Sequence, residues 1–348
     1  MNKPTNSVGL FFLANDSVAY WVVAFLNSLR THNPTLDICL IPFDDNTCLL
    51  RELQSHYGYS IFSQNEVLEE CDTISRMFHE DTRGLYRKLA CWSGPYERFI
   101  YVDTDTVVTQ NIDWIYSLVR EYDFIFTHAP NPNNRQYVWK ESIYGADVLT
   151  PEQIEFSANA GFFASSRSSF TREQIFKAAM LGAQISIHMD LGSSDQAFMN
   201  FLAVTSGKPY TSLSTLSKKG DTKVAFEFWA GYPGGLSWKG NLYYVGVPCN
   251  PRLRGWRRFR PFERPIFLIH WAGYETKRRH SLKAIEIMRM ICSLNLKWVI
   301  TPRLRYKSLW LYYANKCAAA GRYMNLQQLA ELSRNLNRKV TPPEIAYS

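Results

Sequence analysis

The chain has 348 residues, of which 46% are hydrophobic, enough to bury one large domain with an appendage or two domains. It has no apolar run of about 18 residues, so no transmembrane helix is predicted, and the polar segment Met1–Ser7 lacks the order of a signal peptide. Seven scattered cysteines, none at metal-clip spacing, favour reduced thiols and argue against a cysteine zinc site. We therefore expect a cytoplasmic protein.

The net charge of +8 is unevenly distributed. Between Arg252 and Lys339 there are 20 Lys or Arg and 4 Asp or Glu, so this segment carries +16 and the remainder −8. Arg alternates with aromatic residues in Arg252–Arg264 and again in Thr301–Tyr313. This composition suits the anionic inner face of a membrane, where we expect peripheral contact. A solvated surface, a phosphate-closing segment and a dimer surface are the alternatives. No base-stacking or helix-turn-helix motif supports a nucleic-acid partner.

The first part of the chain alternates between short apolar runs and segments with helical spacing. Strands are predicted at Val8–Ala14, Leu36–Pro42, Ser60–Phe62, Arg98–Val102 and Asp123–Thr127. Helices are predicted at Ser17–Arg30, after the cap-like Asp44–Thr47, after a capping box at Ser63–Glu66, and at Gly84–Ser93. This alternation predicts an α/β fold with a mostly parallel central sheet flanked by helices.

Beyond Asn131 the pattern is looser. Strands are predicted at Asn159–Ser165, Tyr243–Val247 and Ile266–His270, and helices at Thr171–Leu181 and Ser193–Val204. The segment Gly207–Gly240 is rich in Gly, Lys, Ser and aromatic residues, and we expect a long functional loop there. From Ser281 to about Arg338 the pattern is helical.

Two carboxylates, Asp103 and Asp105, follow the predicted strand Arg98–Val102. In sheets of this class ligands bind at the carboxyl ends of the strands. Two carboxylates facing one point suit a hard cation such as Mg²⁺ or Mn²⁺, whose remaining ligand positions suit a diphosphate. A cation there would neutralise charge on a departing nucleoside diphosphate. A structural turn could show the same Asp-x-Asp spacing.

Three further positions carry side chains suited to this chemistry. His270 ends a late predicted strand, where a neutral imidazole could be a third metal ligand or a capping residue. Lys88 precedes the strand that leads to the carboxylates, and Lys277 follows His270. Their ammonium groups could hold a diphosphate or be solvated surface charges. Asp195 and Gln196 place an acid beside an amide, although Ser193 and Gln196 also fit a capping box.

Together these stretches resemble glycosyltransferase family 8, the group that includes glycogenin and bacterial lipopolysaccharide galactosyltransferases. The resemblance spans roughly residues 8–280. The similar stretches are Leu13–Asp16 with Ser28–Arg30, Arg87–Trp92, Phe99–Val108, Asn159–Phe163, Asp195 and Gln196 with Asn200, and His270 with Gly273. Lys277 and Tyr20 each lie one residue beyond the family's usual spacing, and the Pro-Trp that usually follows the lysine is absent.

The resemblance implies a GT-A-type fold and a metal-dependent, retaining transfer of a hexose from UDP-glucose or UDP-galactose. It implies Mn²⁺, with Mg²⁺ as the alternative, at Asp103, Asp105 and His270. Asp195 or Gln196 would stabilise the oxocarbenium-like centre. The donor-binding residues that it implies are Asn15, Asp16, Tyr20, Lys88, Thr104, Asn159, Gly161, Gly273 and Lys277. The acceptor could be a glycan, a lipid or a protein, including one of the chain's own 20 tyrosines.

On this basis residues 1–280 form the GT-A domain, with a nucleotide-binding half at 1–135 and an acceptor half at 136–280. Residues 281–348 form a helical basic extension. One alternative is a phosphatase of the haloacid dehalogenase type with Asp103 as nucleophile. Its motif normally lies on the first strand, however, and no convincing later acidic pair is found. Another alternative is a non-catalytic nucleotide-sugar-binding protein, and a nucleic-acid-binding protein would rest on charge alone.

Overall fold

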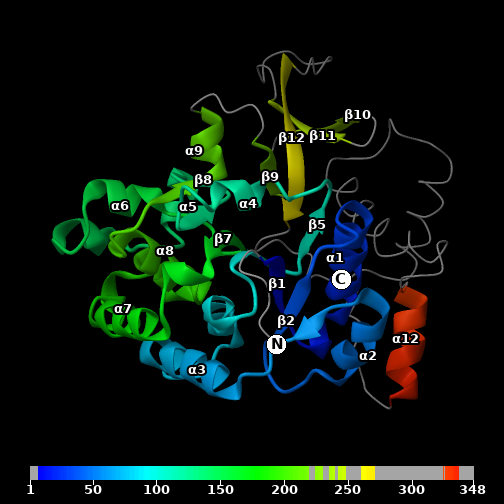
Figure 1. Cartoon of the computed structure of the whole chain (residues 1–348). Coiled ribbons are helices and arrows are strands. Elements are labelled where there is room, and N and C mark those ends of the chain that lie inside the picture. Colours follow the sequence, from blue (N-terminus) through cyan, green and yellow to red (C-terminus); the bar gives the residue numbers. More distant parts are fainter. Residues whose placement is uncertain are drawn as a thin grey trace, which may run out of the picture.

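The computed structural model describes residues 7–218, 224–229, 235–239, 242–247, 260–270, 324 and 326–336 (Figure 1). The strands are β1 (Val8–Ala14), β2 (Ile38–Pro42), β3 (Ser60–Ile61), β4 (Arg98–Val102), β5 (Thr106–Val108), β6 (Phe124–Phe126), β7 (Phe162–Ser166), β8 (Tyr210–Ser212), β9 (Phe226–Trp229), β10 (Gly235–Lys239), β11 (Leu242–Val247) and β12 (Arg260–His270). The α-helices are α1 (Ala19–His32), α2 (Cys48–Tyr57), α3 (Asn65–His79), α4 (Ile115–Leu118), α5 (Pro132–Arg135), α6 (Pro151–Phe156), α7 (Arg172–Gln184), α8 (Gln196–Thr205), α9 (Leu213–Lys218) and α12 (Leu326–Asn335). The 3₁₀ helices are η1 (Asp16–Val18), η2 (Gly84–Ser93), η3 (Glu141–Gly145), η4 (Arg167–Ser169), η5 (Ser186–His188) and η6 (Leu191–Ser193).

A seven-stranded sheet with the order β3-β2-β1-β4-β7-β6-β8 forms the centre of the molecule. The strands from β3 to β4 are parallel, β7 runs antiparallel between β4 and β6, and β8 is again parallel to β6. Helices flank this sheet (Figure 1). The predicted α/β class with a mostly parallel sheet is confirmed.

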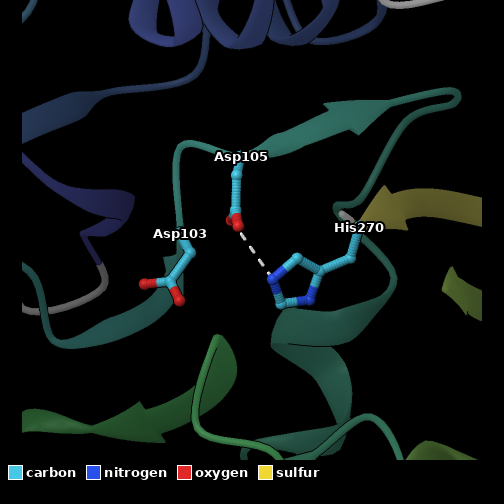
Figure 2. A group of neighbouring side chains, drawn as sticks. All are labelled: Asp103, Asp105 and His270. Atoms are coloured by element: carbon cyan, nitrogen blue, oxygen red, sulfur yellow. Dashed lines mark ion pairs between the residues drawn. The ribbon is translucent and has the colours of Figure 1, made fainter. Parts of the chain in front are cut away.

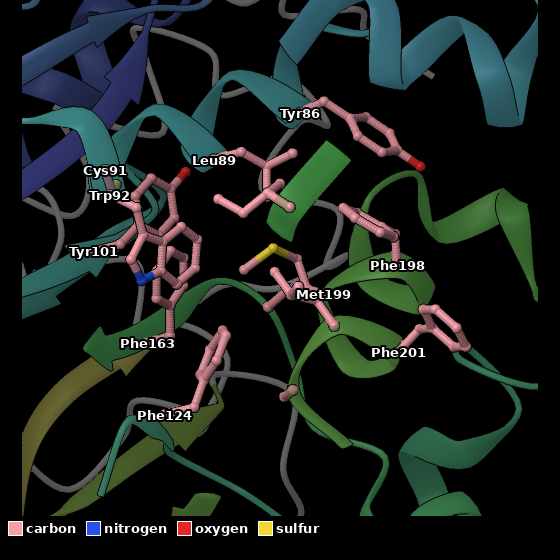
Figure 3. Close-up of a cluster of buried hydrophobic side chains, with 14 of the residues drawn as sticks. Tyr86, Leu89, Cys91, Trp92, Tyr101, Phe124, Phe163, Phe198, Met199 and Phe201 are labelled. Carbon is pink, nitrogen blue, oxygen red and sulfur yellow. The ribbon is translucent and has the colours of Figure 1, made fainter. Parts of the chain in front are cut away.

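The sheet is buried on both faces because its central strands are mostly apolar. In β1, Phe11 and Leu13 belong to one hydrophobic cluster, whereas Leu10 and Phe12 belong to a second cluster on the opposite face. This division follows the two-residue period of strand side chains. Many of the chain's aromatic residues lie in the first cluster (Figure 3). Trp92 there stacks on Phe163 with ring centroids 5.3 Å apart, which fixes η2 against the strand β7.

A second, five-stranded sheet has the order β10-β11-β12-β5, with β9 paired to β12. The strand β12 runs antiparallel to β5, so that His270 lies opposite Thr106. The expected loop at Gly207–Gly240 is therefore wrong, because β8, α9, β9 and β10 lie within it. These strands are short and pair mainly with distant partners, so local sequence carries little signal for them.

The helix predicted at Gly84–Ser93 forms with those bounds, as the 3₁₀ helix η2. Two capping predictions are corrected by the structure. The capping box at Ser63–Glu66 does not form; Gln64 is the N-cap residue of α3, but its side chain donates to the carbonyl of Ser93 at 3.1 Å instead. The helix α8 begins only at Gln196, and Ser193 instead donates its hydroxyl to Asp190 at 3.1 Å. A distant carbonyl thus competes for the Gln64 side chain, and a nearby carboxylate competes for the Ser193 hydroxyl.

The described part of the C-terminal region returns to the N-terminal part of the chain. The helix α12 packs beside α1 (Figure 1), and its fully buried Leu329 joins the second hydrophobic cluster. Asn27 donates its side-chain amide to the carbonyl of Met324 at 3.2 Å. The remainder of the predicted helical extension and most of the basic segment lie outside the described residues. Within the described part, no helix combines the length and apolarity needed to cross a membrane.

Candidate metal and donor-binding site

The Asp-x-Asp motif lies where the chain passes from one sheet to the other. The strand β4 belongs to the seven-stranded sheet and β5 to the second sheet, and only residues 103–105 connect them. The backbone amide of Asp103 donates to the carbonyl of Gly161 at 2.8 Å, and the hydroxyl of Thr106 donates to the carbonyl of Asp103 at 2.7 Å. Both ends of this short connection are therefore fixed.

His270 brings a third potential ligand to the two carboxylates (Figure 2). The ligand atoms of Asp103, Asp105 and His270 lie within 4.8 Å of one another, and His270 Nε2 is 3.2 Å from Asp105 Oδ1. Burial by itself lowers the pKa of His270, but Asp105 and Glu227 outweigh burial and hold that pKa well above its ordinary value. Two carboxylates and one imidazole are a ligand set that fits a divalent cation.

Gly161 leaves the space into which this cluster fits. A Cβ atom at this position would lie 2.8 Å from Asp103 Oδ2 and 2.9 Å from Asn159 Oδ1, and closer still to the His270 ring. Asn159 accepts a hydrogen bond from the Gly161 amide at 2.8 Å, which shapes the turn before β7. A glycine here thus allows the backbone to approach two of the three potential ligands, Asp103 and His270.

Sequence reasoning missed Glu227, which contacts His270 on the side away from Asp105. Glu227 lies on β9 and is 2% exposed, and one of its carboxylate oxygens is hydrogen-bonded to His270 Nδ1. Burial by itself raises the pKa of Glu227, but the ion pair with His270 outweighs it and lowers that pKa. A lone acid between Phe226 and Phe228 is the signal that could have identified it.

Lys88 is the buried cation of the site, with 1% of its surface exposed. Its Nζ lies 2.9 Å from Asp195 Oδ2 and 3.8 Å from Asp103 Oδ1, and it donates to the carbonyl of Ala160 at 3.2 Å. Burial by itself lowers the pKa of Lys88, but Asp103 and Asp195 outweigh burial and raise it above its ordinary value. Burial raises the pKa of Asp195, while Lys88 opposes that shift. An ammonium group is thus held next to the Asp-x-Asp motif.

Two amides on α8 hold the loop that leads to Gly161. Asn200 accepts from the backbone amide of Ala158 at 2.7 Å and donates to its carbonyl at 2.8 Å. Gln196 accepts from the Ala160 amide at 3.4 Å and donates to the Tyr137 carbonyl at 3.0 Å. Both ends of the Gln196 side chain are occupied by backbone, which suits a role in shaping the site.

A cavity of about 530 Å³ opens beside the two carboxylates. Its lining includes polar residues from the end of β1 and aromatic residues from α1. The lining residues are Leu13, Ala14, Asn15, Ser17, Val18, Tyr20, Trp21, Phe43, Leu85, Asp103, Thr104 and Asp105. The structure thus brings Asn15, Tyr20 and Thr104 together with the metal-binding candidates and adds Trp21, which the sequence analysis did not select.

Asp16 is oriented differently from its neighbours and does not line this cavity. It is 3% exposed, and its carboxylate accepts hydrogen bonds from the amides of Leu49 and Leu50, both at 3.0 Å. These amides belong to the first turn of α2, whose own N-cap residue Thr47 makes no side-chain cap. Asp16 therefore caps α2 from a distance, and its expected contact with a nucleoside stays a prediction. Gly273 and Lys277 lie outside the described residues.

The architecture is similar to that of solved glycosyltransferase structures. An active-site mutant of LgtC aligns over 86% of this chain and 99% of its own, with 15% identity and a TM-score of 0.50. The fold is of the GT-A type. A galactosyltransferase LgtC structure with donor and acceptor sugar analogues aligns over 86% of this chain and 99% of its own, with 13% identity and a TM-score of 0.46.

The glycosyltransferase GlyE of Streptococcus pneumoniae TIGR4 aligns with 11% identity and a TM-score of 0.43 over 91% of this chain. The matched region spans 65% of the length of GlyE. No protein-family profile matches the sequence, and no curated protein matches it. At these identities the likeness establishes the fold alone.

Proposed function

We propose that this protein is a metal-dependent, retaining glycosyltransferase of family 8 that transfers a hexose from UDP-glucose or UDP-galactose to a glycan, lipid or protein acceptor. The observation that carries this proposal is the arrangement of Asp103, Asp105 and His270 beside a cavity with an aromatic wall. That arrangement offers a cation site and a nucleotide-sized space in direct contact, on a fold that glycosyltransferases share.

The three candidate ligands fit Mn²⁺, with Mg²⁺ as the alternative. Their donor atoms converge, and the missing side chain of Gly161 leaves room next to them. When bound, the cation supplies Lewis-acid stabilisation of the charge on a departing diphosphate. The chain's own contribution is to hold the three ligands together from two different sheets.

The donor would lie along the cavity with its base near α1 and its diphosphate near the carboxylates. Tyr20 and Trp21 offer aromatic faces for the base, and Asn15 offers an amide at the end of β1. The Lys88 ammonium lies close enough to the Asp-x-Asp motif to stabilise negative charge on the leaving group. It also holds Asp195 in place through their ion pair.

Asp195 is the better candidate than Gln196 for stabilising the oxocarbenium-like centre. Its carboxylate is buried beside Lys88 and carries no second protein hydrogen bond at Oδ2, whereas the Gln196 amide is engaged by backbone at both ends. In a retaining transfer such a carboxylate would act on the face of the sugar opposite the diphosphate. Gln196 would then position the loop that carries Asn159 and Gly161.

Release of nucleoside diphosphate from a panel of nucleotide sugars, with Mn²⁺ or with EDTA, tests the proposal. We expect metal-dependent release from one donor, by transfer or by slow hydrolysis, and its loss in Asp103→Asn and Asp105→Asn. Asp147→Asn is the matched control because Asp147 is exposed and its φ of 54° is one that Asn also tolerates. Phosphate release from a phosphomonoester without any donor turnover would instead support the phosphatase alternative. Donor binding without turnover would support a binding protein.

We also propose peripheral contact with an anionic membrane, motivated by the +16 charge between Arg252 and Lys339. Sedimentation with vesicles that contain phosphatidylserine tests this contact. We expect retention at low salt and release at high salt, because exposed charges are screened. No retention at low salt would contradict it.

A further inference from the structure

We propose that Glu227 is a positioning residue that fixes the ring orientation and tautomer of His270 and thereby sets the affinity of the cation site. This inference rests on the proposed metal site and adds a residue outside its three ligands. It follows from the contacts of one buried acid that the transfer chemistry described above does not use.

Glu227 reaches His270 through the pairing of neighbouring strands. The strand β9 runs parallel to β12, with Phe228 opposite Ile269 and Trp229 opposite His270. This register places the side chain of Glu227 beside the imidazole, where its Oε1 is hydrogen-bonded to His270 Nδ1. The side chains of both residues are almost fully buried, at 0% and 2% exposure. The contact is therefore part of the packed interior, where side chains have little freedom to rearrange.

The second oxygen of Glu227 is also held. The hydroxyl of Thr127, at the end of β6, donates to Glu227 Oε2. His128 Nε2 lies 2.8 Å from the backbone carbonyl of Glu227 and 3.9 Å from its Oε2. Because both carboxylate oxygens have partners, the orientation of Glu227 is itself fixed. The contacts thus form a chain from Thr127 through Glu227 to His270.

The two nitrogens of His270 are used for different contacts. A carboxylate can only accept, so Nδ1 must carry the hydrogen that it donates to Glu227. In the neutral ring this leaves the lone pair on Nε2, the nitrogen that lies 3.2 Å from Asp105 Oδ1 (Figure 2). A carboxylate behind a ligating histidine orients the ring and increases its basicity as a ligand. Glu227 therefore fixes Nε2 as the nitrogen that faces the cation site.

Apolar packing alone does not account for this acid. Burying a carboxylate is costly unless it is paired and hydrogen-bonded, and replacing a buried ion pair by apolar residues of similar volume is often neutral or stabilising. Glu227 lies between Phe226 and Phe228 on a strand that could be apolar throughout. A role toward His270 explains why a charge stands there.

The test is Glu227→Gln, which keeps the shape of the side chain and removes its charge. Glu52→Gln is the matched control because Glu52 is exposed on α2. Mn²⁺ alone is the probe: its free EPR signal gives the dissociation constant, and nitrogen modulation of the bound-ion echo reports whether the imidazole coordinates. We expect Glu227→Gln to raise the dissociation constant by about 10- to 100-fold and to weaken the nitrogen modulation. Glu52→Gln should change neither readout.

Thr127→Val provides a second, milder variant that also decides the matter if Glu227→Gln does not fold. It removes the hydroxyl that holds Oε2, so we expect a smaller rise in the dissociation constant and a weaker nitrogen modulation. An unchanged dissociation constant and unchanged modulation in the folded variants would overturn the role of Glu227 while leaving the metal site intact. Failure of the wild-type protein to bind Mn²⁺ would overturn the metal site itself, and this inference with it.

Discussion

Replacing Gly161 by alanine is the sharpest perturbation of the proposed cation site. The new Cβ would lie 2.8 Å from Asp103 Oδ2, 2.9 Å from Asn159 Oδ1 and closer still to the His270 ring. Favourable carbon contacts begin at about 3.5 Å, so these groups must move by several tenths of an ångström up to about 1 Å. Gly161 also accepts the hydrogen bond from the Asp103 amide, so the backbone cannot easily retreat.

Overpacking of this kind costs about 1–3 kcal/mol of folding stability, whereas a displacement of about 1 Å in a catalytic group can cost about 100-fold in rate. We therefore expect Gly161→Ala to remain folded and to lose about 100-fold in donor turnover, with weaker Mn²⁺ binding. Gly145→Ala is the control, because a Cβ there meets nothing within 4 Å. Donor turnover measures the rate, Mn²⁺ EPR the metal affinity, and urea denaturation the stability. Wild-type turnover and metal affinity in a folded Gly161→Ala protein would refute this reasoning.

Three further substitutions test other parts of the site. Lys88→Met should lower the free energy of unfolding by about 3–5 kcal/mol because it leaves Asp195 buried without its partner. Urea denaturation should show that adding Asp195→Asn restores part of that loss. Full stability in the single variant would contradict the burial argument. Trp21→Ala should weaken donor binding by about 1–3 kcal/mol if the indole ring stacks on the base. Calorimetry measures this loss, with Tyr20→Phe as the control because it keeps an aromatic ring. Asp16→Ala should lower the free energy of unfolding by about 1 kcal/mol because the cap of α2 is lost, and it should leave the donor affinity near that of the wild type. A large loss of affinity without a loss of stability would show instead that Asp16 contacts the nucleoside.

Much of the N-terminal part of the fold could be predicted from local sequence. The strands β1 and β4 have the predicted bounds, because a short run of consecutive apolar residues between polar turns suits a strand buried on both faces. The position of Asp103 at the end of β4 follows from the same pattern. Predictions that failed depend on distant partners, as for β8, which pairs with β6, and β9, which pairs with β12.

The sequence by itself thus determined the α/β class, the early strands and the carboxylate pair, because each of these depends on residues close together in the chain. The sequence could propose His270 as a third ligand, but only the tertiary structure brings it to the pair and places Glu227 behind it. The pairing of β5 with β12 sets His270 beside Asp105, and the pairing of β9 with β12 sets Glu227 behind it. Side-chain direction was equally beyond local pattern, since Asp16 points to the first turn of α2 while Trp21 lines the cavity. The physical reason is that strand pairing and side-chain packing couple residues far apart in sequence, and no local periodicity records those contacts.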